Sequence, residues 1–284
     1  MKTRLIIFIA ILAAGLDFSA SAQRPTRFHN EAADTTRLTL MLINLSDIGR
    51  TLSPQQLVAQ AGRMMIDTPY GAGTLEGEPE MVTVNLDSLD CTTFVENAIA
   101  MAMTIENHRN SWQDFIYNLE TLRYKDGKVD GYPSRLHYIS DWIVDNSHRG
   151  NLQEVTDRIG KADYIVKTLD FMSSNRNLYP ALANDETFSK IKDREIGYRS
   201  HRYPAIKPQN VKSADIREGD IIAITTTKKG LDVTHLGIAV EVDGEIHLMH
   251  ASSKAKRVII DPLTLSEYLR RNRTTAGIRV IRLK

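Results

Sequence analysis

The sequence predicts an α+β protein, because helical and extended patterns are segregated along the chain. Apolar residues recur at helical spacing in the first half, whereas short β-rich segments, separated by turn residues such as Asp243-Gly244, follow from residue 216. No internal repeat or low-complexity linker divides the 284 residues. Helices followed by an antiparallel sheet are typical of the α+β class.

The N-terminus has the three regions of a secretory signal peptide. Lys2 and Arg4 give a positive start, residues 5–16 are apolar, and Ala20-Ser21-Ala22 supplies small residues for cleavage. We predict a signal peptide over residues 1–22 and export to the periplasm of a bacterium. An uncleaved membrane anchor is the alternative, although the apolar run is short for a membrane span.

Composition narrows the function classes. The chain has 36 basic and 35 acidic residues, a formal net charge of +1, so we expect no nucleic-acid partner. No later segment has the roughly 18 uninterrupted apolar residues of a membrane helix, so we expect no stable membrane anchor. We expect a flexible segment over residues 23–33 and a single domain over residues 34–284.

Caps and apolar faces predict the helices of the first half. Asp34 is predicted to cap the first, Ser53-Pro54 begins the second, and the Cys91 segment forms a third that ends near Glu106. Residues 67–80, rich in glycine and proline, are predicted to form a loop.

Two further helices and an irregular region follow. The pattern predicts helices over Trp112–Tyr124 and from Leu136 to about Val144, with a loop between them. Residues 150–210 mix short helical and irregular pieces, and we interpret them as an insertion in the domain.

The last third carries the strand signals. Four segments are β-rich, a helix is predicted over Thr264–Arg271, and residues 277–284 form a final strand. The four segments are residues 216–225, 233–242, 245–252 and 256–261. Asp243-Gly244 is a two-residue turn signal that joins the second and third of them in a hairpin.

Cys91 is the only cysteine in the chain, so it cannot form an internal disulfide. A lone cysteine commonly packs as a small apolar residue. Asp90 as N-cap would instead place this thiol in the first turn of a helix, at the positive end of the helix dipole. Such positions lower the pKa of a cysteine and favour the nucleophilic thiolate.

A cysteine nucleophile needs a base that receives its proton and later delivers it to the leaving group. Strand alternation places His235, Gly237 and Ala239 on one face of their strand, where the small residues leave room for the Cys91 helix. In the predicted hairpin, His250 falls near the His235 end and could accept a hydrogen bond that orients the His235 ring. A surface histidine on an edge strand is the alternative for His235.

A zinc site is the competing interpretation of Cys91, His235 and His250, because one sulfur and two nitrogens are acceptable zinc ligands. We predict no metal and no cofactor.

Five motifs occur in the order found in NlpC/P60-type cysteine peptidases: PYGAGTLE, LDCTTFVE, REGDIIAIT, THLGIAVEV and HLMHAS. The chain most resembles the DUF1460 branch of that superfamily. The branch features are TPYxxGTLE at 68–76, DCTTFVE at 90–96, PSRLHYISDWI at 133–143 and GLDVTHLG at 230–237. One departure from the wider superfamily is Thr92-Thr93, where Ser-Gly usually follows the cysteine.

The resemblance implies a papain-like core, in which N-terminal helices carrying the nucleophile pack on a C-terminal antiparallel sheet, with helical additions. It implies Cys91 as nucleophile, His235 as base and His250 as its orienting partner. It also implies a periplasmic N-acetylmuramoyl-L-alanine amidase that acts on peptidoglycan fragments, with 1,6-anhydro-muropeptides as the preferred substrates.

Four further residues are candidates for substrate binding, each with a structural alternative. Tyr70 is expected beside Cys91, where it could polarise the scissile carbonyl or simply anchor its loop. Arg135 could bind a sugar hydroxyl or carboxylate, or form an ion pair. Asp90 could act only as a cap, and Asp232 could contact substrate or shape its turn.

Two other functions remain open from the sequence. The chain could be an endopeptidase that cuts between γ-D-glutamate and the diamino acid of the stem peptide. It could also be a non-catalytic muropeptide-binding protein. We expect a monomer in each case.

Overall fold

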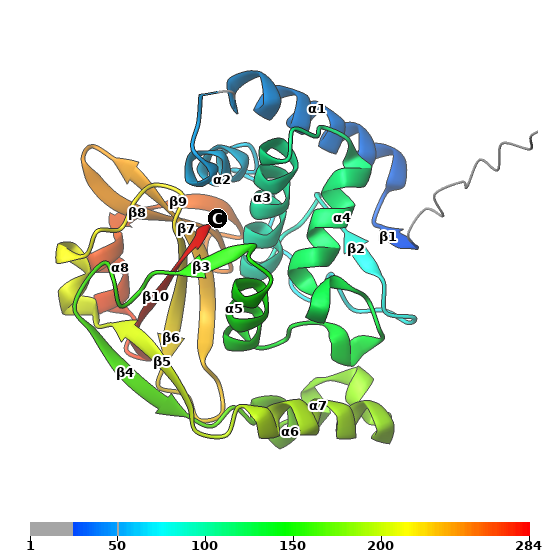
Figure 1. Cartoon of the computed structure of the whole chain (residues 1–284), viewed down its shortest axis with the longest axis vertical. Helices are drawn as coiled ribbons and strands as arrows, with labels where there is room; N and C mark the ends of the chain where they lie inside the picture. Colours follow the sequence, from blue (N-terminus) through cyan, green and yellow to red (C-terminus); the bar gives the residue numbers. More distant parts are fainter. Residues whose placement is uncertain (1–24, 50) are drawn as a thin grey trace, which may run out of the picture.

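A layer of helices covers one face of a large antiparallel sheet in the computed structural model, which describes residues 25–49 and 51–284 (Figure 1). The α-helices are α1 (Glu31–Gly49), α2 (Pro54–Arg63), α3 (Cys91–Glu106), α4 (Trp112–Arg123), α5 (Ile139–His148), α6 (Phe171–Ser174), α7 (Asp185–Gly197) and α8 (Leu265–Arg271). Short 3-10 helices are η1 (Lys125–Gly127), η2 (Tyr132–Ser134), η3 (Arg176–Leu178), η4 (Pro180–Ala183) and η5 (Pro208–Ser213). The predicted signal peptide and its cleavage site lie outside the described residues.

The large sheet contains eight strands and all of its pairings are antiparallel. Seven strands follow in the order β4-β5-β10-β6-β7-β8-β9, and β3 also pairs with β10. Their bounds are β3 (Leu152–Glu154), β4 (Ala162–Lys167), β5 (His201–Ile206), β6 (Ile221–Thr226), β7 (Val233–Val242), β8 (Glu245–Ser252), β9 (Arg257–Thr264) and β10 (Thr275–Leu283). A separate parallel pair joins β1 (Thr26–Phe28) to β2 (Val82–Val84).

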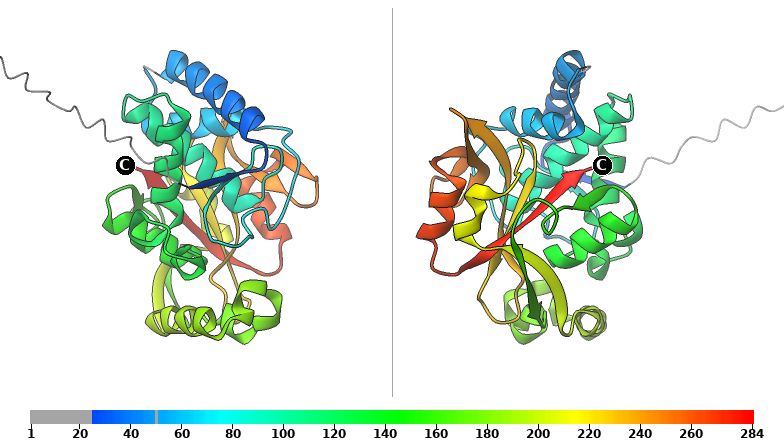
Figure 2. Two further views of the ribbon diagram at one scale, coloured as in Figure 1. Left: turned by 90° about the vertical axis from the view of Figure 1, so that its right-hand side faces the viewer. Right: turned by 60° about the vertical axis from the view of Figure 1, so that its left-hand side comes forward.

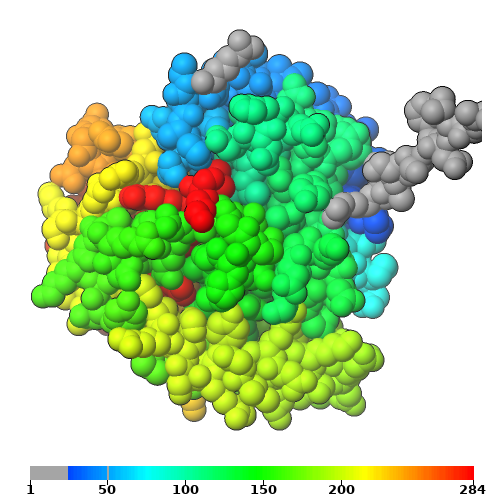
Figure 3. Space-filling view, viewed as in Figure 1, coloured from blue at the N-terminus to red at the C-terminus, as the bar shows by residue number. Residues whose placement is uncertain are grey.

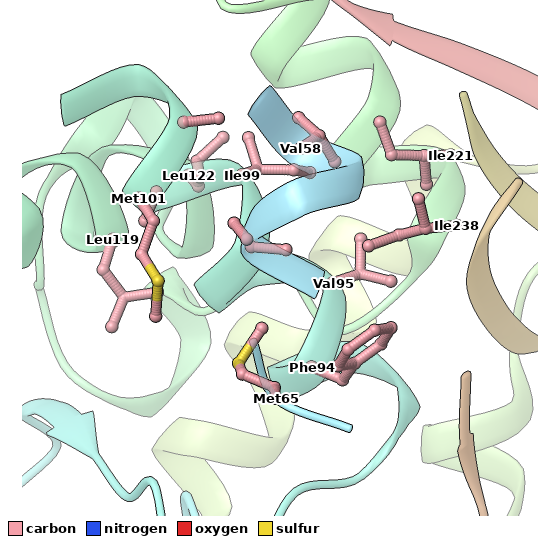
Figure 4. Packing of buried hydrophobic residues seen from close by; sticks show 14 of the residues in the cluster. Val58, Met65, Phe94, Val95, Ile99, Met101, Leu119, Leu122, Ile221 and Ile238 are labelled. Carbon is pink, nitrogen blue, oxygen red and sulfur yellow. The ribbon is translucent and has the colours of Figure 1, made fainter. Parts of the chain in front are cut away.

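Helix α3 lies at the centre of the helical layer, where it packs against α2, α4 and β7. Its apolar side chains form a core with those of α2, α4 and the sheet, seen in Figure 4 around Phe94, Val95 and Ile238. The packing is close, because a Cβ atom at Gly62 of α2 would lie 2.4 Å from Met249 Cε and 3.3 Å from Phe94 Cζ. A larger residue at position 62 would therefore require the Met249 side chain to move.

The opposite face of the sheet is also buried. Helix α8 covers it with Leu265 and Leu269, which pack in a second core with Ala239 and Leu248. The views in Figure 2 show α8 on the side of the sheet away from the helical layer. The segment with α6 and α7 forms a third, smaller core and makes up one end of the molecular surface in Figure 3.

Most predicted elements are confirmed. Helix α3 spans Cys91–Glu106, and β7 and β8 coincide with the predicted segments. Ser53 caps α2 through a capping box with Gln56. The hairpin turn has positive φ at both Asp243 (50°) and Gly244 (81°), as a type I′ turn requires.

The prediction that Asp34 caps the first helix is wrong, because α1 begins three residues earlier, at Glu31. The Oδ1 atom of Asn30 accepts a hydrogen bond from Ala33 N at 3.2 Å. Asp34 is 1% exposed inside the helix, and its carboxylate accepts hydrogen bonds from the main-chain N–H groups of Asn30 and Leu86. It therefore ties α1 to the segment before α3.

Three other segments differ from the predictions. Strand β1 and the start of α1 occupy part of the segment predicted as flexible, residues 23–33. Helix α5 begins at Ile139 rather than at Leu136. Residues 150–210 contain β3, β4 and β5, which belong to the main sheet, so only the stretch with α6 and α7 is an addition to it.

No helix among the described residues is long and apolar enough to cross a membrane.

The core around α3 predicts a large loss of stability on truncation of Phe94, which is fully buried. Phe94→Ala should lower the free energy of unfolding by about 3 to 5 kcal/mol, because it removes buried apolar surface and leaves a cavity. Denaturant unfolding followed by circular dichroism measures this change. The control Leu40→Ala, at a position of α1 that is 58% exposed, should change it by less than about 0.5 kcal/mol. Equal effects of the two substitutions would contradict the packing described.

Candidate active site

Cys91 is the first residue of α3, and its position is fixed by a capping box. Asp90 Oδ1 accepts a hydrogen bond from Thr93 N at 2.8 Å, and Thr93 Oγ1 accepts one from Asp90 N at 2.9 Å. These bonds satisfy two N–H groups that have no partner within the helix. The predicted cap is confirmed, and it holds the thiol in the first turn of a helix whose remaining length is largely buried.

Helix α3 packs on the face of β7 opposite to the one expected. Leu236, Ile238 and Val240 share the core of the helical layer with α3, whereas Ala239 packs in the core beneath α8. The predicted alternation of side chains along β7 is confirmed, but both faces of the sheet are buried, so alternation alone did not show which face contacts α3. The small residue at 237 accommodates β8 rather than a helix, since a Cβ atom there would lie 2.6 Å from Leu248 Cδ1.

The thiol meets β7 near the start of that strand, where regular pairing is interrupted. Ile224 pairs with His235 and Thr225 with Val233, so Thr234 is an extra residue in β7. The main-chain N–H of Leu236, the residue after His235, is close enough to Cys91 to stabilise its thiolate. Among the described residues, no hydrogen bond joins Cys91 directly to His235; the structure brings the thiol to the adjoining main chain.

His235 and His250 form a pair. His235 Nε2 lies 2.6 Å from His250 Nδ1, and the two rings are perpendicular with centroids 4.8 Å apart. The β7–β8 hairpin produces this contact, because its register pairs Ile238 with Met249 and so places both histidines at the same end. The arrangement is the one expected for a histidine oriented by a second histidine.

Asp261 and Tyr268 complete the surroundings of His250, and the sequence analysis assigned a role to neither. Asp261 Oδ2 lies 3.6 Å from His250 Nε2, within the range of an ion pair but longer than a hydrogen bond. The Tyr268 ring packs edge-on against His250 with centroids 5.4 Å apart. The one available signal for Asp261 was a carboxylate that ends the β-rich segment RVIID, beside the strand with His250.

Burial favours the neutral forms of both Cys91 and His235. Burial is the main cause that raises the pKa of the Cys91 thiol to about 11, and the neighbouring Asp90 carboxylate adds to the rise. Hydrogen bonds from nearby N–H groups and from Thr92 favour the thiolate but have a smaller effect. Burial is also the main cause that lowers the pKa of His235 to about 3, and the neighbouring His250 adds to this effect. The expectation of a thiol pKa lowered by the helix is therefore wrong, because removal of water outweighs the positive end of α3.

His250 is also held neutral, because burial lowers its pKa more than the Asp261 carboxylate raises it. The surroundings therefore favour a neutral thiol and two neutral imidazoles, with the Asp90 carboxylate beside the thiol and the Asp261 carboxylate beside His250.

Tyr70 lies in the loop before α3. Its main-chain N–H donates a hydrogen bond to Lys256 O at 2.9 Å, and its side chain is partly buried against the core. Burial raises the pKa of the Tyr70 hydroxyl, and the nearby Cys91 and Asp90 raise it further. The hydroxyl therefore lies within electrostatic range of the Cys91 thiol. Tyr70 is therefore near the thiol, and its contact with substrate stays a prediction.

Arg135 and Asp232 have buried positions. Arg135 is 6% exposed, lies over the Tyr132 ring and forms ion pairs with Glu76 and Glu80 at 3.1 and 3.3 Å. Asp232 is 1% exposed and accepts a hydrogen bond from Ser140 N. These contacts favour the structural alternatives, an ion pair and a shaped turn, over direct contact with substrate.

Within residues 25–49 and 51–284, no three His, Cys, Asp or Glu side chains are arranged to hold a metal ion. The described groups at this site are a thiol, two imidazoles in contact with one another, and a carboxylate close to the second imidazole.

Residues 60–278 match the AmiA-like family, described as N-acetylmuramoyl-L-alanine amidase-like. The crystal structure of an N-acetylmuramoyl-L-alanine amidase from Bacteroides uniformis is 40% identical, with a TM-score of 0.78 over 81% of this chain and 99% of that chain. A Bacteroides fragilis structure named as a xylanase candidate is also 40% identical, with a TM-score of 0.75 over 79% of this chain and 100% of that chain.

A Legionella pneumophila protein assigned to DUF1460 has the same fold at 21% identity, with a TM-score of 0.66 over 89% of this chain and 97% of that chain. No curated protein matches the chain.

The raised thiol pKa predicts how alkylation depends on pH. Inactivation by iodoacetamide should accelerate about tenfold per pH unit from pH 7 to 9, because only the thiolate reacts and a thiol of pKa about 11 is protonated throughout. The rate of mass increase measures this at one site, since Cys91 is the only cysteine. A short unstructured peptide with one cysteine, whose thiol pKa is ordinary, is the control, and its alkylation rate should begin to level off near pH 8 to 9. A protein rate that is constant from pH 6 upward would instead indicate a thiolate at rest.

Proposed function

The chain belongs to the AmiA-like family of N-acetylmuramoyl-L-alanine amidase-like proteins, and we propose that it is a cysteine amidase. The proposed reaction cleaves the amide between the lactyl group of muramic acid and the first alanine of the stem peptide. The observation that carries this proposal is the placement of Cys91, at a capped helix N-terminus, next to the strand that holds the His235–His250 pair.

The proton positions follow from the contacts of the histidine pair. For His235 to act as a base through Nδ1, its own proton must lie on Nε2 and be donated to His250 Nδ1. His250 then carries its proton on Nε2, the atom that faces Asp261. Asp261 therefore fixes the tautomer of His250, and His250 fixes that of His235.

The reaction then proceeds in two steps. The Cys91 sulfur attacks the lactyl carbonyl while its proton moves to His235 Nδ1, and His235 delivers that proton to the alanine nitrogen as the amide bond breaks. The product of this step is a thioester, with the stem peptide released as a free amine. Water, deprotonated by the same imidazole, attacks the thioester and releases muramic acid with a free lactyl carboxylate.

The charge that develops on the carbonyl oxygen needs hydrogen-bond donors. The main-chain N–H of Cys91, in the first turn of α3, is one donor, and the Tyr70 hydroxyl is the second. A tyrosine whose pKa is raised stays protonated at neutral pH and keeps its ability to donate.

The fold and the substrate are proposed on the same basis. The helical layer carrying Cys91 against an antiparallel sheet carrying the histidines is what a papain-like NlpC/P60 core would require. The preferred substrate is proposed to be a 1,6-anhydro-muropeptide of the periplasm. The addition around η4 and α7 lines a cavity of about 770 Å³ with the loops at residues 76–80 and 130–133, a site of suitable size for part of a saccharide.

Hydrolysis of a glycosidic bond, as the name of the Bacteroides fragilis structure suggests, fits this site less well. Glycoside hydrolysis normally uses two carboxyl groups on either side of the bond. Here Asp90 is hydrogen-bonded as the helix cap, and Asp261 lies against His250. The attacking group in our proposal is the Cys91 thiol.

Substitution of the nucleophile tests the function. Cys91→Ala and His235→Ala should each lower kcat on an anhydro-muropeptide by at least about a thousandfold, because the thiol and its base act as a unit. Liquid chromatography with mass spectrometry should find the intact stem peptide and a peptide-free sugar with the wild-type chain. His29→Ala, at a histidine side chain that is 60% exposed, is the control and should retain activity.

Three results would oppose the assignment. A shortened stem peptide would indicate an endopeptidase, and no turnover of any muropeptide would indicate a binding protein. Loss of activity with a chelator and insensitivity to iodoacetamide would restore the zinc alternative.

Export is proposed from the N-terminal sequence. Expression with the full signal segment in a Gram-negative host should yield a mature protein that begins at Gln23 and is recovered from the periplasm. N-terminal sequencing of that fraction measures the cleavage site. A protein that keeps Met1 and sediments with membranes would contradict the proposal.

A further inference from the structure

A cavity of about 430 Å³ opens beside the histidine pair, and both His235 and His250 line it. Three cationic side chains also line it, and each comes from a different segment. Lys228 lies between β6 and β7, Lys254 between β8 and β9, and Arg271 ends α8. We refer to this space as the basic cavity.

The positive charge of the basic cavity is not neutralised by its own walls. Asp261 is the one acidic residue that lines it, and that side chain is 14% exposed and directed to His250. Lys228, Lys254 and Arg271 are exposed, and none of them forms an ion pair with another described residue. Glu267 lies near Arg271, but Thr264 is the group that chiefly holds its carboxylate.

The larger cavity, of about 770 Å³, has the opposite charge. Five acidic residues line it, with Lys190 as the one cation, and that lysine is paired with an acidic neighbour at 2.7 Å. The five are Glu76, Glu78, Glu80, Asp130 and Glu186. Three of the five are paired with cations, Glu76 and Glu80 with Arg135 and Glu186 with Lys190, which reduces the negative charge of the lining. Of the two cavities, the basic cavity is the one that favours a ligand rich in carboxylates.

The chemistry of the reaction decides which half of the substrate meets each cavity. The group that protonates the leaving nitrogen must lie within hydrogen-bond reach of it. His235 has that role in the proposed mechanism, and it lines the basic cavity. The leaving group, which is the stem peptide, therefore lies on the same side as Lys228, Lys254 and Arg271.

We infer that the basic cavity is the subsite for the released stem peptide and that its three cations bind the free carboxylates of that peptide. This inference rests on the proposed amidase function and extends it to the specificity of the enzyme. The sugar, which carries no free carboxylate before cleavage, then extends toward the acidic cavity. The two cavities of opposite charge thus set the direction in which the substrate binds.

Two triple variants with the same change in net charge test the subsite. Lys228→Gln, Lys254→Gln and Arg271→Gln together remove the three cations of the cavity. Lys229→Gln, Lys256→Gln and Arg273→Gln together remove three nearby exposed cations that do not line it. The probes are one muropeptide with free stem carboxylates and the same muropeptide with those carboxylates amidated.

The ratio of KM for the amidated probe to KM for the acidic probe should fall at least about fivefold in the first triple variant, since each exposed ion pair contributes a small but additive amount. The second triple variant should keep the wild-type ratio. Titration calorimetry of both probes, with Cys91→Ala added to each background so that the probes stay intact, should give the same pattern in Kd. An equal change of the ratio in both triple variants, or no change in either, would overturn the inference.

The same experiments separate this inference from the proposed function. Absence of stem-peptide release by the wild-type chain would refute the amidase, whereas the calorimetric ratio would still decide whether the cavity recognises carboxylates. Inorganic phosphate is a further arm of the calorimetry. Displacement of the acidic probe by phosphate at equal concentration would assign the cavity to small anions and overturn the peptide subsite.

Discussion

The packing of α3 between the other helices and the sheet is the contact on which the rest of the structure depends. Twelve of its sixteen residues are buried, and Gly62 allows α2 to approach the sheet closely over Phe94. A buried ion pair joins Glu96 of α3 to Arg123 of α4 at 2.6 Å, and Arg123 also donates to Thr83 O. A helix held on all sides cannot shift along the sheet, so its first residue, Cys91, has a fixed position relative to β7.

The same burial determines the chemistry of the site. Removal of water disfavours both a thiolate and an imidazolium, so it raises the pKa of Cys91 and lowers the pKa of His235, and the neutral form of each is favoured. In the proposed reaction, charge separates during the attack itself, close to the Leu236 and Cys91 N–H groups that favour the thiolate. The same proposal uses the His235–His250–Asp261 contacts to orient the base.

Much of the fold was accessible from local sequence, and the failures have physical causes. Helix α3 and strands β7 and β8 were predicted with their exact bounds because cap, turn and period signals agree there. Strands β4 and β5 were missed because β4 is an edge strand whose exposed residues, Tyr164 and Val166 among them, show no clean alternation. Asp34 was predicted to be a cap because the sequence does not distinguish an aspartate that caps its own helix from one that accepts a hydrogen bond from a distant main-chain N–H, here that of Leu86.

Local sequence was sufficient to predict the elements of the candidate site: a capped cysteine, two histidines on a hairpin and a glycine-rich loop with Tyr70. Only the tertiary structure decided which face of β7 receives α3, that Asp261 and Tyr268 join His250, and that Arg135 and Asp232 are buried among partners. The division follows from the range of the interactions. Caps, turns and strand periods act over a few residues, whereas burial, pKa and the pairing of charges depend on segments that are distant in the chain.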